Sequence, residues 1–439
     1  MPQYAAILGH QPHISIAELA AVAPGFAQTG TFEKFILLFE SSADLSQETL
    51  NHLGGIIVMA KQIQSSSGLA LEDIPKIVAN ETAGVKGKIT FGLRCYGITP
   101  KEVHALYRES KHHLKKAGRP SRYIGTERKP AVPVLLHDTG VVNGQHGCEI
   151  MLLSAKKGFD GGAEVLPEPE LWFGRTVFAQ DIDAYAKRDM EKPARDTTVG
   201  LLPPKLAQIL LNFGAWLAKP GSGLRTSFGS AQDKSDKGKP TKSEIRNSKS
   251  FTILDPFCGT GVIPMEALLR GWNVIASDIM QKAVNACDKN LEWLRKEESI
   301  LKRDVTSTVF KHDAVKPFDL KEMPDMIVTE TSLGPPLTHR PTIKDAQKLK
   351  TENEKLQAGF LKNMAVCFPG VPVVCTWPVW YHSKGQIHLE KIWETLHDIG
   401  YHATLPPGIE SDVEGRLSLV YRRPDQFVGR EIVMLVPKK

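Results

Sequence analysis

Apolar residues recur in a regular order along the first part of the chain. Short apolar runs at 4–8, 34–39 and 56–59 have the spacing of strands, and the segments from Ser15 and over 47–53 have helical spacing. These two periods distinguish strands from amphipathic helices. Strands and helices that alternate over so short a length predict a ferredoxin-like α+β unit, to which we assign residues 1–75.

The next region, residues 80–175, alternates in the same way and carries a dense group of basic residues. Strands are predicted at 89–96, 132–136 and 148–154, and a helix at 100–118. Nine Lys or Arg residues and three acidic residues lie between Lys101 and Lys129. Such a stretch suits an RNA phosphate backbone, and a solvated helix face explains it equally well. The candidate RNA-binding residues are Lys111, Lys115, Lys116, Arg119 and Arg122.

The remaining apolar pattern predicts a third, larger domain. Residues 176–218 contain a linking segment and a helix that begins at Pro203 and Pro204, since proline is tolerated at a helix start. One predicted strand ends at Asp255. Further strands are predicted at 273–277, 309–311, 326–329, 371–376, 417–421 and 431–436. Helices fall between the earlier strands, and a short turn joins the last two as a hairpin. We therefore expect residues 251–439 to form an α/β domain whose mostly parallel, doubly wound sheet ends in an antiparallel hairpin.

Residues 219–250 interrupt this pattern. They contain eight basic and three acidic residues, much Ser and Gly, and almost no apolar side chain. Such a composition buries too little apolar surface to offset the entropy of ordering the chain. We predict a flexible basic insertion here.

Composition narrows the class of protein. The chain has 439 residues, 41% of them hydrophobic and 24% charged, which is typical of a globular protein of two or three domains. It contains no run of ~20 apolar residues, and its N-terminus lacks the features of a secretory signal, so we expect no membrane partner and a cytoplasmic location. The six cysteines form no C-x-x-C pair, which argues against a zinc site and a disulfide framework. We therefore predict no metal site.

The most informative chemistry lies in the turn after the first strand of the third region. Residues 255–261 read Asp-Pro-Phe-Cys-Gly-Thr-Gly, a helical pattern follows, and the next strand ends at Asp278. Glycines let backbone N–H groups approach a ligand, and an acid at the tip of the second strand suits ribose hydroxyls. The turn has no Gly-Lys-Ser/Thr for a triphosphate, and it lacks the third glycine expected for a pyrophosphate. The pattern predicts a nucleoside site.

This turn closely resembles the first motif of class I S-adenosylmethionine-dependent methyltransferases that act on base amines. The order of regions and the segments Trp172–Thr176, Pro193–Asp196 and Gly200–Ala207 are similar to those of the THUMP-domain tRNA methyltransferases that modify a guanosine amine. The resemblance implies a class I (Rossmann-like) methyltransferase sheet preceded by ferredoxin-like and THUMP-like α+β domains. It also implies S-adenosylmethionine as cofactor, tRNA as partner and guanine N2 as target. The cofactor-binding residues it implies are Asp255, Pro256, Phe257, Gly259, Gly261, Asp278 and Asp313.

Two of these assignments rest on particular contacts. Asp313 follows the third strand, where relatives place an acid or amide against the adenine amine, and a simple helix cap is the alternative. In relatives the fourth strand ends in Asp or Asn, two prolines and an aromatic ring that stacks on the base. This chain reads Thr329-Glu330-Thr331-Ser332-Leu333 there, so Glu330 is the candidate catalytic acceptor for the amine. The candidate stacking rings are Trp377, Trp380 and Tyr381.

Two other functions fit the same sequence. A DNA methyltransferase of base amines shares the motifs, although domains ahead of the catalytic one favour structured RNA. An RNA-binding protein that keeps the cofactor fold without catalysis fits the changed fourth strand. The need for a partner subunit stays open.

Overall fold

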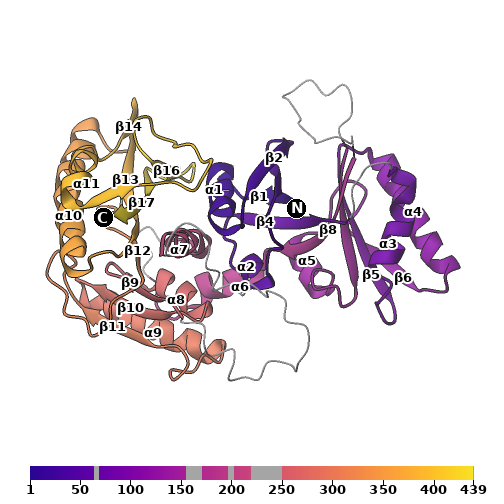
Figure 1. Ribbon diagram of the computed structural model, residues 1–439, viewed down its shortest axis with the longest axis horizontal. Coiled ribbons are helices and arrows are strands. Elements are labelled where there is room, and N and C mark those ends of the chain that lie inside the picture. The colour runs from indigo at the N-terminus through magenta and orange to yellow at the C-terminus, as the bar shows by residue number, and fades with distance from the viewer. Residues whose placement is uncertain (64–68, 155–170, 196–201, 219–249, 439) are drawn as a thin grey trace. The chain divides into compact units, whose positions relative to one another are not determined.

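The computed structural model describes residues 1–63, 69–154, 171–195, 202–218 and 250–438 (Figure 1). The predicted basic insertion therefore lies outside the described residues, apart from Ser250. The chain divides into two compact units. The first comprises residues 1–51 and 55–186, and the second comprises residues 52–54 and 187–439.

The first unit is built on one mixed sheet of eight strands in the order β2-β3-β1-β4-β8-β7-β5-β6. Its elements are β1 (Gln3–Leu8), α1 (Pro12–Val22), β2 (Ala27–Phe32), β3 (Ile36–Glu40), α2 (Gln47–Asn51), β4 (Ile56–Gln62), η1 (Leu71–Asp73), α3 (Ile74–Glu81), β5 (Ile89–Tyr96), α4 (Pro100–Lys116), β6 (Ser121–Ile124), α5 (Pro133–Asp138), β7 (Gly147–Ser154), β8 (Leu171–Ala179) and α6 (Ile182–Ala186). The first six follow the β-α-β-β-α-β order of a ferredoxin-like unit. Strand β4 pairs antiparallel with β8, so the sheet continues into the second predicted region.

One predicted strand of this unit is a helix, and several elements, among them β2, α3, β6 and β8, were not predicted. The run at 132–136 forms helix α5 instead of a strand, with Pro133 at its first position, where the missing N–H costs nothing. Strand β2 was not predicted, because it is an edge strand of Ala, Gln, Thr and Gly with one phenylalanine, and only Gly30 and Phe32 are buried. An edge strand of this kind has no apolar alternation for the sequence to reveal.

The second unit contains a nine-stranded sheet, and seven of its strands follow the order β11-β10-β9-β12-β13-β17-β15. Its elements are η2 (Lys187–Glu191), α7 (Pro204–Ala218), β9 (Thr252–Asp255), α8 (Val262–Leu269), β10 (Asn273–Asp278), α9 (Gln281–Glu297), β11 (Ser307–Lys311), β12 (Met326–Glu330), α10 (Ile343–Cys367), β13 (Val373–His382), β14 (Gly385–Ile387), α11 (Lys391–Ile399), β15 (Tyr401–Ala403), β16 (Ser418–Tyr421) and β17 (Val428–Pro437). Strands β9 to β13 pair in parallel, and β17 runs antiparallel to both β13 and β16. The predicted class I methyltransferase sheet with its antiparallel hairpin is confirmed.

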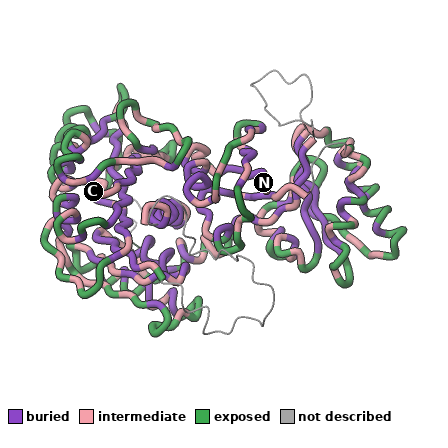
Figure 2. The backbone as a smooth tube through the Cα atoms, viewed as in Figure 1, coloured by how far each residue is buried: buried purple, intermediate pink, exposed green. Residues whose placement is uncertain are grey.

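Helices cover both faces of this sheet. Figure 1 shows α7 on one face and α10 and α11 on the other. Phe360 of α10 and Leu396 of α11 pack with Ile327 and Val373 of the central strands. Figure 2 shows the strands and α7 as buried and the outer helices as partly exposed. Because both faces are covered, the open ends of the parallel strands are where a ligand can reach the domain.

No helix among the described residues is long and apolar enough to span a bilayer.

Candidate functional site

A large cavity opens at the carboxyl ends of the parallel strands in the second unit. Its volume is about 1140 Å³, more than the 300–1,000 Å³ that ligand pockets commonly have. The predicted residues that line it are Asp255, Pro256, Phe257, Gly259, Asp278, Asp313 and Glu330. The fold therefore brings together, around one cavity, side chains that come from four different strand ends.

The glycines of the turn have two different structural roles. Gly259 has a φ of +50°, and a Cβ built on it would meet no atom within 4 Å, so its backbone faces open space. Gly261 does not line the cavity. It caps α8 with a φ of +86°, and a Cβ there would lie 2.7 Å from the sulfur of Cys287. Gly259 thus leaves room beside the backbone, whereas Gly261 allows α8 to pack against α9.

Asp278 at the end of β10 holds the turn from the neighbouring strand. Its Oδ2 accepts a hydrogen bond from the backbone N–H of Gly259 at 3.1 Å, and its Oδ1 accepts one from Met280 at 2.9 Å. A carboxylate has about four lone-pair sites, so it can accept further hydrogen bonds from a ligand. Asp278 therefore both shapes the turn and offers acceptors to the cavity.

Asp313 follows β11 and also serves a local turn. Its Oδ1 accepts a hydrogen bond from the N–H of Val315 at 3.2 Å, and its carbonyl accepts one from Lys316 at 2.8 Å. No helix begins after it, so the simple helix-cap alternative is not what the structure contains. The side chain caps a short turn at the wall of the cavity.

Asp255 is the most deeply buried carboxyl group of the site. It is 2% exposed, and its Oδ1 accepts hydrogen bonds from Thr329 Oγ1 at 2.6 Å and from the N–H of Phe257 at 3.3 Å. Burial raises the pKa of Asp255 to about 7, with the two hydrogen bonds opposing the rise. The carboxyl ties β9 to β12 directly beneath the turn.

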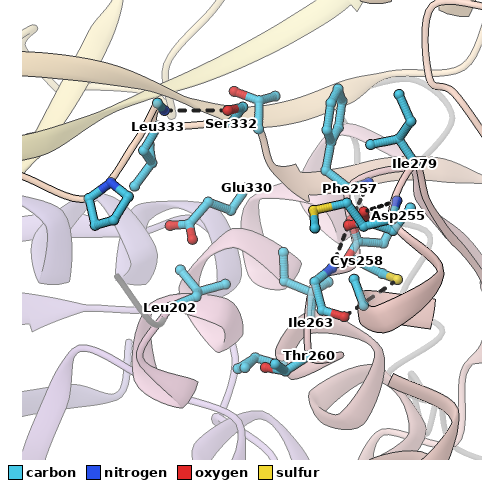
Figure 3. Close-up of a pocket in the computed structure, with 18 of the residues that line it drawn as sticks. Leu202, Asp255, Phe257, Cys258, Thr260, Ile263, Ile279, Glu330, Ser332 and Leu333 are labelled. Atoms are coloured by element: carbon cyan, nitrogen blue, oxygen red, sulfur yellow. Dashed lines mark hydrogen bonds between the residues drawn. The ribbon is translucent and has the colours of Figure 1, made fainter. Parts of the chain in front are cut away.

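Glu330, the candidate catalytic residue, ends β12 and is paired with an arginine from β17. Its Oε1 accepts a hydrogen bond from Arg430 Nε at 2.5 Å, and the side chains of Glu330 and Arg430 are 17% and 2% exposed. Burial raises the pKa of Glu330 above its ordinary value, and Arg430 acts against that rise. In Figure 3 the carboxylate points away from Asp255, on the side where Leu202 and Leu333 lie. Arg430 lies about a hundred residues away in sequence, and nothing in the local pattern indicated it.

Hydrogen bonds hold the segment after β12, which lacks, in register, the two prolines of the resembled family. Thr331 Oγ1 donates to the carbonyl of Thr376 at 2.6 Å, and Asn353 Nδ2 donates to the carbonyl of Ser332 at 2.8 Å. These two bonds tie the segment to β13 and α10. Leu333 stands where the resembled family carries the stacking ring, and it lines the cavity.

The predicted stacking rings lie elsewhere. Trp377 and Trp380 are fully buried, and Tyr381 contacts Arg422; none of them lines the cavity. They belong to β13 beyond the end of β12, where that strand pairs with β17 and faces the core. The aromatic rings in the cavity wall are Phe257 and Phe427, and Phe427 was missed because it lies in the irregular loop before β17.

A buried amide joins the segment ahead of α7 to the glycine turn. Asn290 of α9 is fully buried, its Oδ1 accepts from the N–H of Ala194 at 2.9 Å, and its Nδ2 donates to the carbonyls of Ala194 at 2.9 Å and Thr260 at 2.8 Å. Pro193, Ala194 and Arg195 consequently line the cavity. Among the predicted linking residues, these three are therefore part of the site.

The first unit has a second, shallower depression on α4 and β6. Its volume is about 330 Å³, and its walls are formed by His104, Tyr107, Arg108, Lys111, His112, Lys115 and Tyr123. Tyr123 is 43% exposed, and Lys111 Nζ lies 6.0 Å from the centre of its ring. The depression combines cations with an exposed aromatic ring.

The other predicted RNA-binding residues are arranged differently. Lys116 is exposed at the end of α4. Arg119 donates to the backbone carbonyls of Thr82 and Val85 and so holds the C-terminal end of α3. Arg122 Nε donates to Thr90 Oγ1 at 3.0 Å. Of the five, Lys111 and Lys115 are those that line the depression.

In the described part of the chain, no cluster of three or more potential metal ligands is found.

Comparison with known proteins gives one family match and several structural similarities. The family described as conserved hypothetical protein 95 matches residues 239–359, which include the glycine turn, Asp278, Asp313 and Glu330. TrmN from Thermus thermophilus is similar over 100% of both chains, with 15% sequence identity and a TM-score of 0.45.

Two further solved structures are similar at a lower level. A possible methylase from Clostridium difficile 630 covers 100% of this chain and 98% of its own, with 10% identity and a TM-score of 0.40. Magnesium protoporphyrin IX methyltransferase (ChlM) from Synechocystis PCC 6803 with bound SAM covers 58% of this chain and 94% of its own, with 14% identity and a TM-score of 0.31. The fold assignment rests on strand order, and the site on the cavity geometry.

Proposed function

We propose that this protein transfers a methyl group from S-adenosylmethionine to the exocyclic amine of an RNA base, with guanine N2 of a tRNA as the target. One observation carries the proposal. The cavity at the strand ends has the open Gly259 backbone and the Asp278 and Asp313 carboxylates in its walls, together with Glu330. The Gly259 backbone and the two aspartates suit a nucleoside cofactor, and Glu330 suits an amine.

The residues around the cavity fit this cofactor. Asp278 has acceptor sites for ribose hydroxyls, and Asp313 has an acceptor for an adenine amine. Arg195 brings a positive charge to the wall, where a carboxylate of an amino acid would be favoured. The cavity volume of about 1140 Å³ exceeds what a single nucleoside-sized ligand requires, which leaves room for a base as well.

The reaction requires that the substrate amine is held in position and that a nearby group accepts its hydrogen bonds. The cofactor supplies a methyl group on sulfur, and the amine nitrogen takes it while sulfur keeps the bonding electrons and nitrogen releases a proton. Holding the amine in line with that methyl group supplies much of the rate. Glu330 would accept a hydrogen bond from the amine through Oε2, since Oε1 is occupied by Arg430. Phe257 and Phe427 are the rings available to stack on the base.

An RNA-binding protein without methyl transfer is the second candidate, and two observations favour it. Arg430 occupies one oxygen of Glu330, and Leu333 replaces the stacking ring of the resembled family. An arginine that neutralises the Glu330 carboxylate would make it a weaker acceptor for an amine proton. This candidate keeps cofactor binding and RNA binding and lacks turnover.

Labelled S-adenosylmethionine and unmodified tRNA test the proposal. We expect the wild-type protein to transfer label to tRNA, and an excess of duplex DNA of equal length should not compete. Calorimetry of cofactor binding gives the second readout. Cofactor binding without transfer would support the RNA-binding candidate, and transfer to duplex DNA in place of tRNA would support a DNA methyltransferase.

Asp278→Ala tests the cofactor site itself. Hydrogen bonds to charged groups contribute about 1.5–3 kcal/mol, so the dissociation constant for S-adenosylmethionine should rise at least tenfold. Asp288→Ala, an exposed residue on α9, is the matched control. Equal affinities for the Asp278→Ala variant and wild type would reject the assignment.

A further inference from the structure

Arg430 is a buried cation in the wall of the cavity with more hydrogen-bonding capacity than the protein uses. The residue is 1% exposed, its Nε donates to Glu330, and its Nη1 lies 3.4 Å from Gln426 Oε1. Its Nη2 is buried and has no hydrogen-bond partner among the described residues. An unpaired charged donor in a protein interior is unfavourable, and a ligand that accepts from it would remove that cost.

The sheet explains how this arginine reaches the site. Glu330 ends β12 opposite Thr376 of β13, and Arg430 of β17 lies opposite Pro378, two residues further along β13. Strands β13 and β17 thus continue past the end of β12. The guanidinium therefore lies beside the Glu330 carboxylate at the strand ends, where the cavity opens.

The pair presents one donor and one acceptor next to each other. The Nε and Nη2 atoms share an edge of the planar guanidinium, and Nε bonds Glu330 Oε1. Nη2 then stands beside a carboxylate whose Oε2 accepts no hydrogen bond from the described residues. Arg430 Nη2 is the donor and Glu330 Oε2 is the acceptor beside it. Together they complement a base that has a ring carbonyl adjacent to a ring N–H.

We propose that Arg430 and Glu330 together read the Watson–Crick edge of a lactam base, with Arg430 donating to the ring carbonyl and Glu330 accepting from the N–H groups beside it. This inference rests on the proposed function and names the residues that select its target base. Guanine has a carbonyl, a ring N–H and an exocyclic amine in a row, so it satisfies both residues and places its amine at the carboxylate. Adenine and cytosine present an amine where Arg430 requires an acceptor, and uracil has no amine to methylate.

Arg430 is then a specificity residue, and it selects the base through its Nη2 atom. Arg430→Lys keeps a positive charge beside Glu330 and removes the planar fork. Good bidentate contacts discriminate between bases by roughly one order of magnitude or more. The variant should therefore keep the fold and cofactor affinity within about twofold and lose at least tenfold in affinity for a lactam base. Arg423→Lys, an exposed arginine in the loop between β16 and β17 and outside the cavity wall, is the matched control.

Nucleoside binding tests this without turnover. The protein is saturated with S-adenosylhomocysteine, which blocks the adenosine subsite, and guanosine, inosine, 2-aminopurine riboside and adenosine are compared by saturation-transfer NMR. We expect wild type and Arg423→Lys to bind guanosine and inosine at least tenfold better than the other two, and Arg430→Lys to lose that preference. Inosine has the lactam edge without the amine, so its binding isolates the contact from catalysis.

Three results would overturn the proposal. They are equal binding of adenosine and guanosine, inosine binding by Arg430→Lys as tight as by wild type, and no binding of any of the four nucleosides. None of these depends on methyl transfer. A protein that prefers guanosine and inosine without modifying tRNA would keep this inference and lose the proposed activity. One that methylates guanine in tRNA but binds inosine as tightly after Arg430→Lys as before would do the reverse.

Discussion

Asp255 shows how a single buried carboxyl group can make stability depend on pH. Its side chain connects β9 to β12 through Thr329, in a position closed to solvent. Burial raises its pKa to about 7, well above the ordinary value of 3.8. The native state therefore binds this proton more tightly than the unfolded state does. Its contribution to stability is complete at low pH and is lost as the pH rises from about 4 through 7.

Asp255→Asn removes this dependence and keeps an oxygen for Thr329 and Phe257. Relative to wild type, the variant's free energy of unfolding should rise by about 3 kcal/mol between pH 5 and pH 8, because about two pH units separate pH 5 from the pKa of about 7 and each contributes ~1.4 kcal/mol. Urea unfolding at the two pH values measures the difference. A gap between the two proteins that is the same at pH 5 and pH 8 would show that Asp255 stays ionised in the native state.

At the scale of elements, Asn290 is the contact that joins three parts of the site. It lies on α9 and bonds both the segment at Ala194 and the turn at Thr260. Asn290→Ala should lower the free energy of unfolding by about 2–3 kcal/mol, because backbone groups that are partly buried lose their partners. The dissociation constant for S-adenosylmethionine should rise as well, since two walls of the cavity lose their connection.

Asn285→Ala is the matched control for this element. Asn285 is exposed on the same helix and bonds Gln281 at its surface. Its replacement should change the free energy of unfolding by no more than about 0.5 kcal/mol. Denaturant unfolding and calorimetry of both variants decide the matter, and equal effects at positions 290 and 285 would contradict the role of Asn290.

The elements that sequence patterns predicted are those with a strong local signal. The βα turn at 255–261 and the acid at 278 come from one continuous βαβ segment, so their spacing alone places them together. Arg430 and Phe427 reach the same cavity through strand pairing far along the chain, and no local period encodes that pairing. The segment 132–136 was predicted as a strand because of its apolar run, but it forms a helix that begins at Pro133.

For the whole molecule, we propose that the first unit contacts RNA while the second unit carries the chemistry. Lys111 and Lys115 line the depression beside Tyr123. Replacing both lysines by Ala should weaken tRNA binding about tenfold at moderate salt and reduce the salt dependence, because each lost phosphate contact removes ~0.7–0.9 from the slope. Cofactor affinity should be unchanged. Filter binding over a salt series measures both effects.

A charge-matched control separates this site from a general charge effect. Lys86 and Lys88 are exposed in the same unit and lie outside the depression, so replacing both by Ala removes equal charge. If this control weakens tRNA binding as much as the Lys111 and Lys115 pair does, the depression is only a solvated helix face.

In the proposed reaction a methyl group passes to a base amine, and Glu330 is the acceptor for that amine. Because Arg430 holds one oxygen of Glu330, Glu330→Gln should keep its oxygen on Arg430 and turn its NH₂ toward the substrate amine, where donor meets donor. Transfer should slow by roughly 100-fold, in the range for a lost general base, while calorimetry shows cofactor binding unchanged.

The most direct measurement is mass spectrometry of nucleosides from unmodified tRNA after incubation with S-adenosylmethionine carrying a deuterated methyl group. We expect labelled N2-methylguanosine with the wild-type protein and about a hundredth of that rate with Glu330→Gln. Label on any other nucleoside, no label at all with wild type, or equal rates for the two proteins would contradict it.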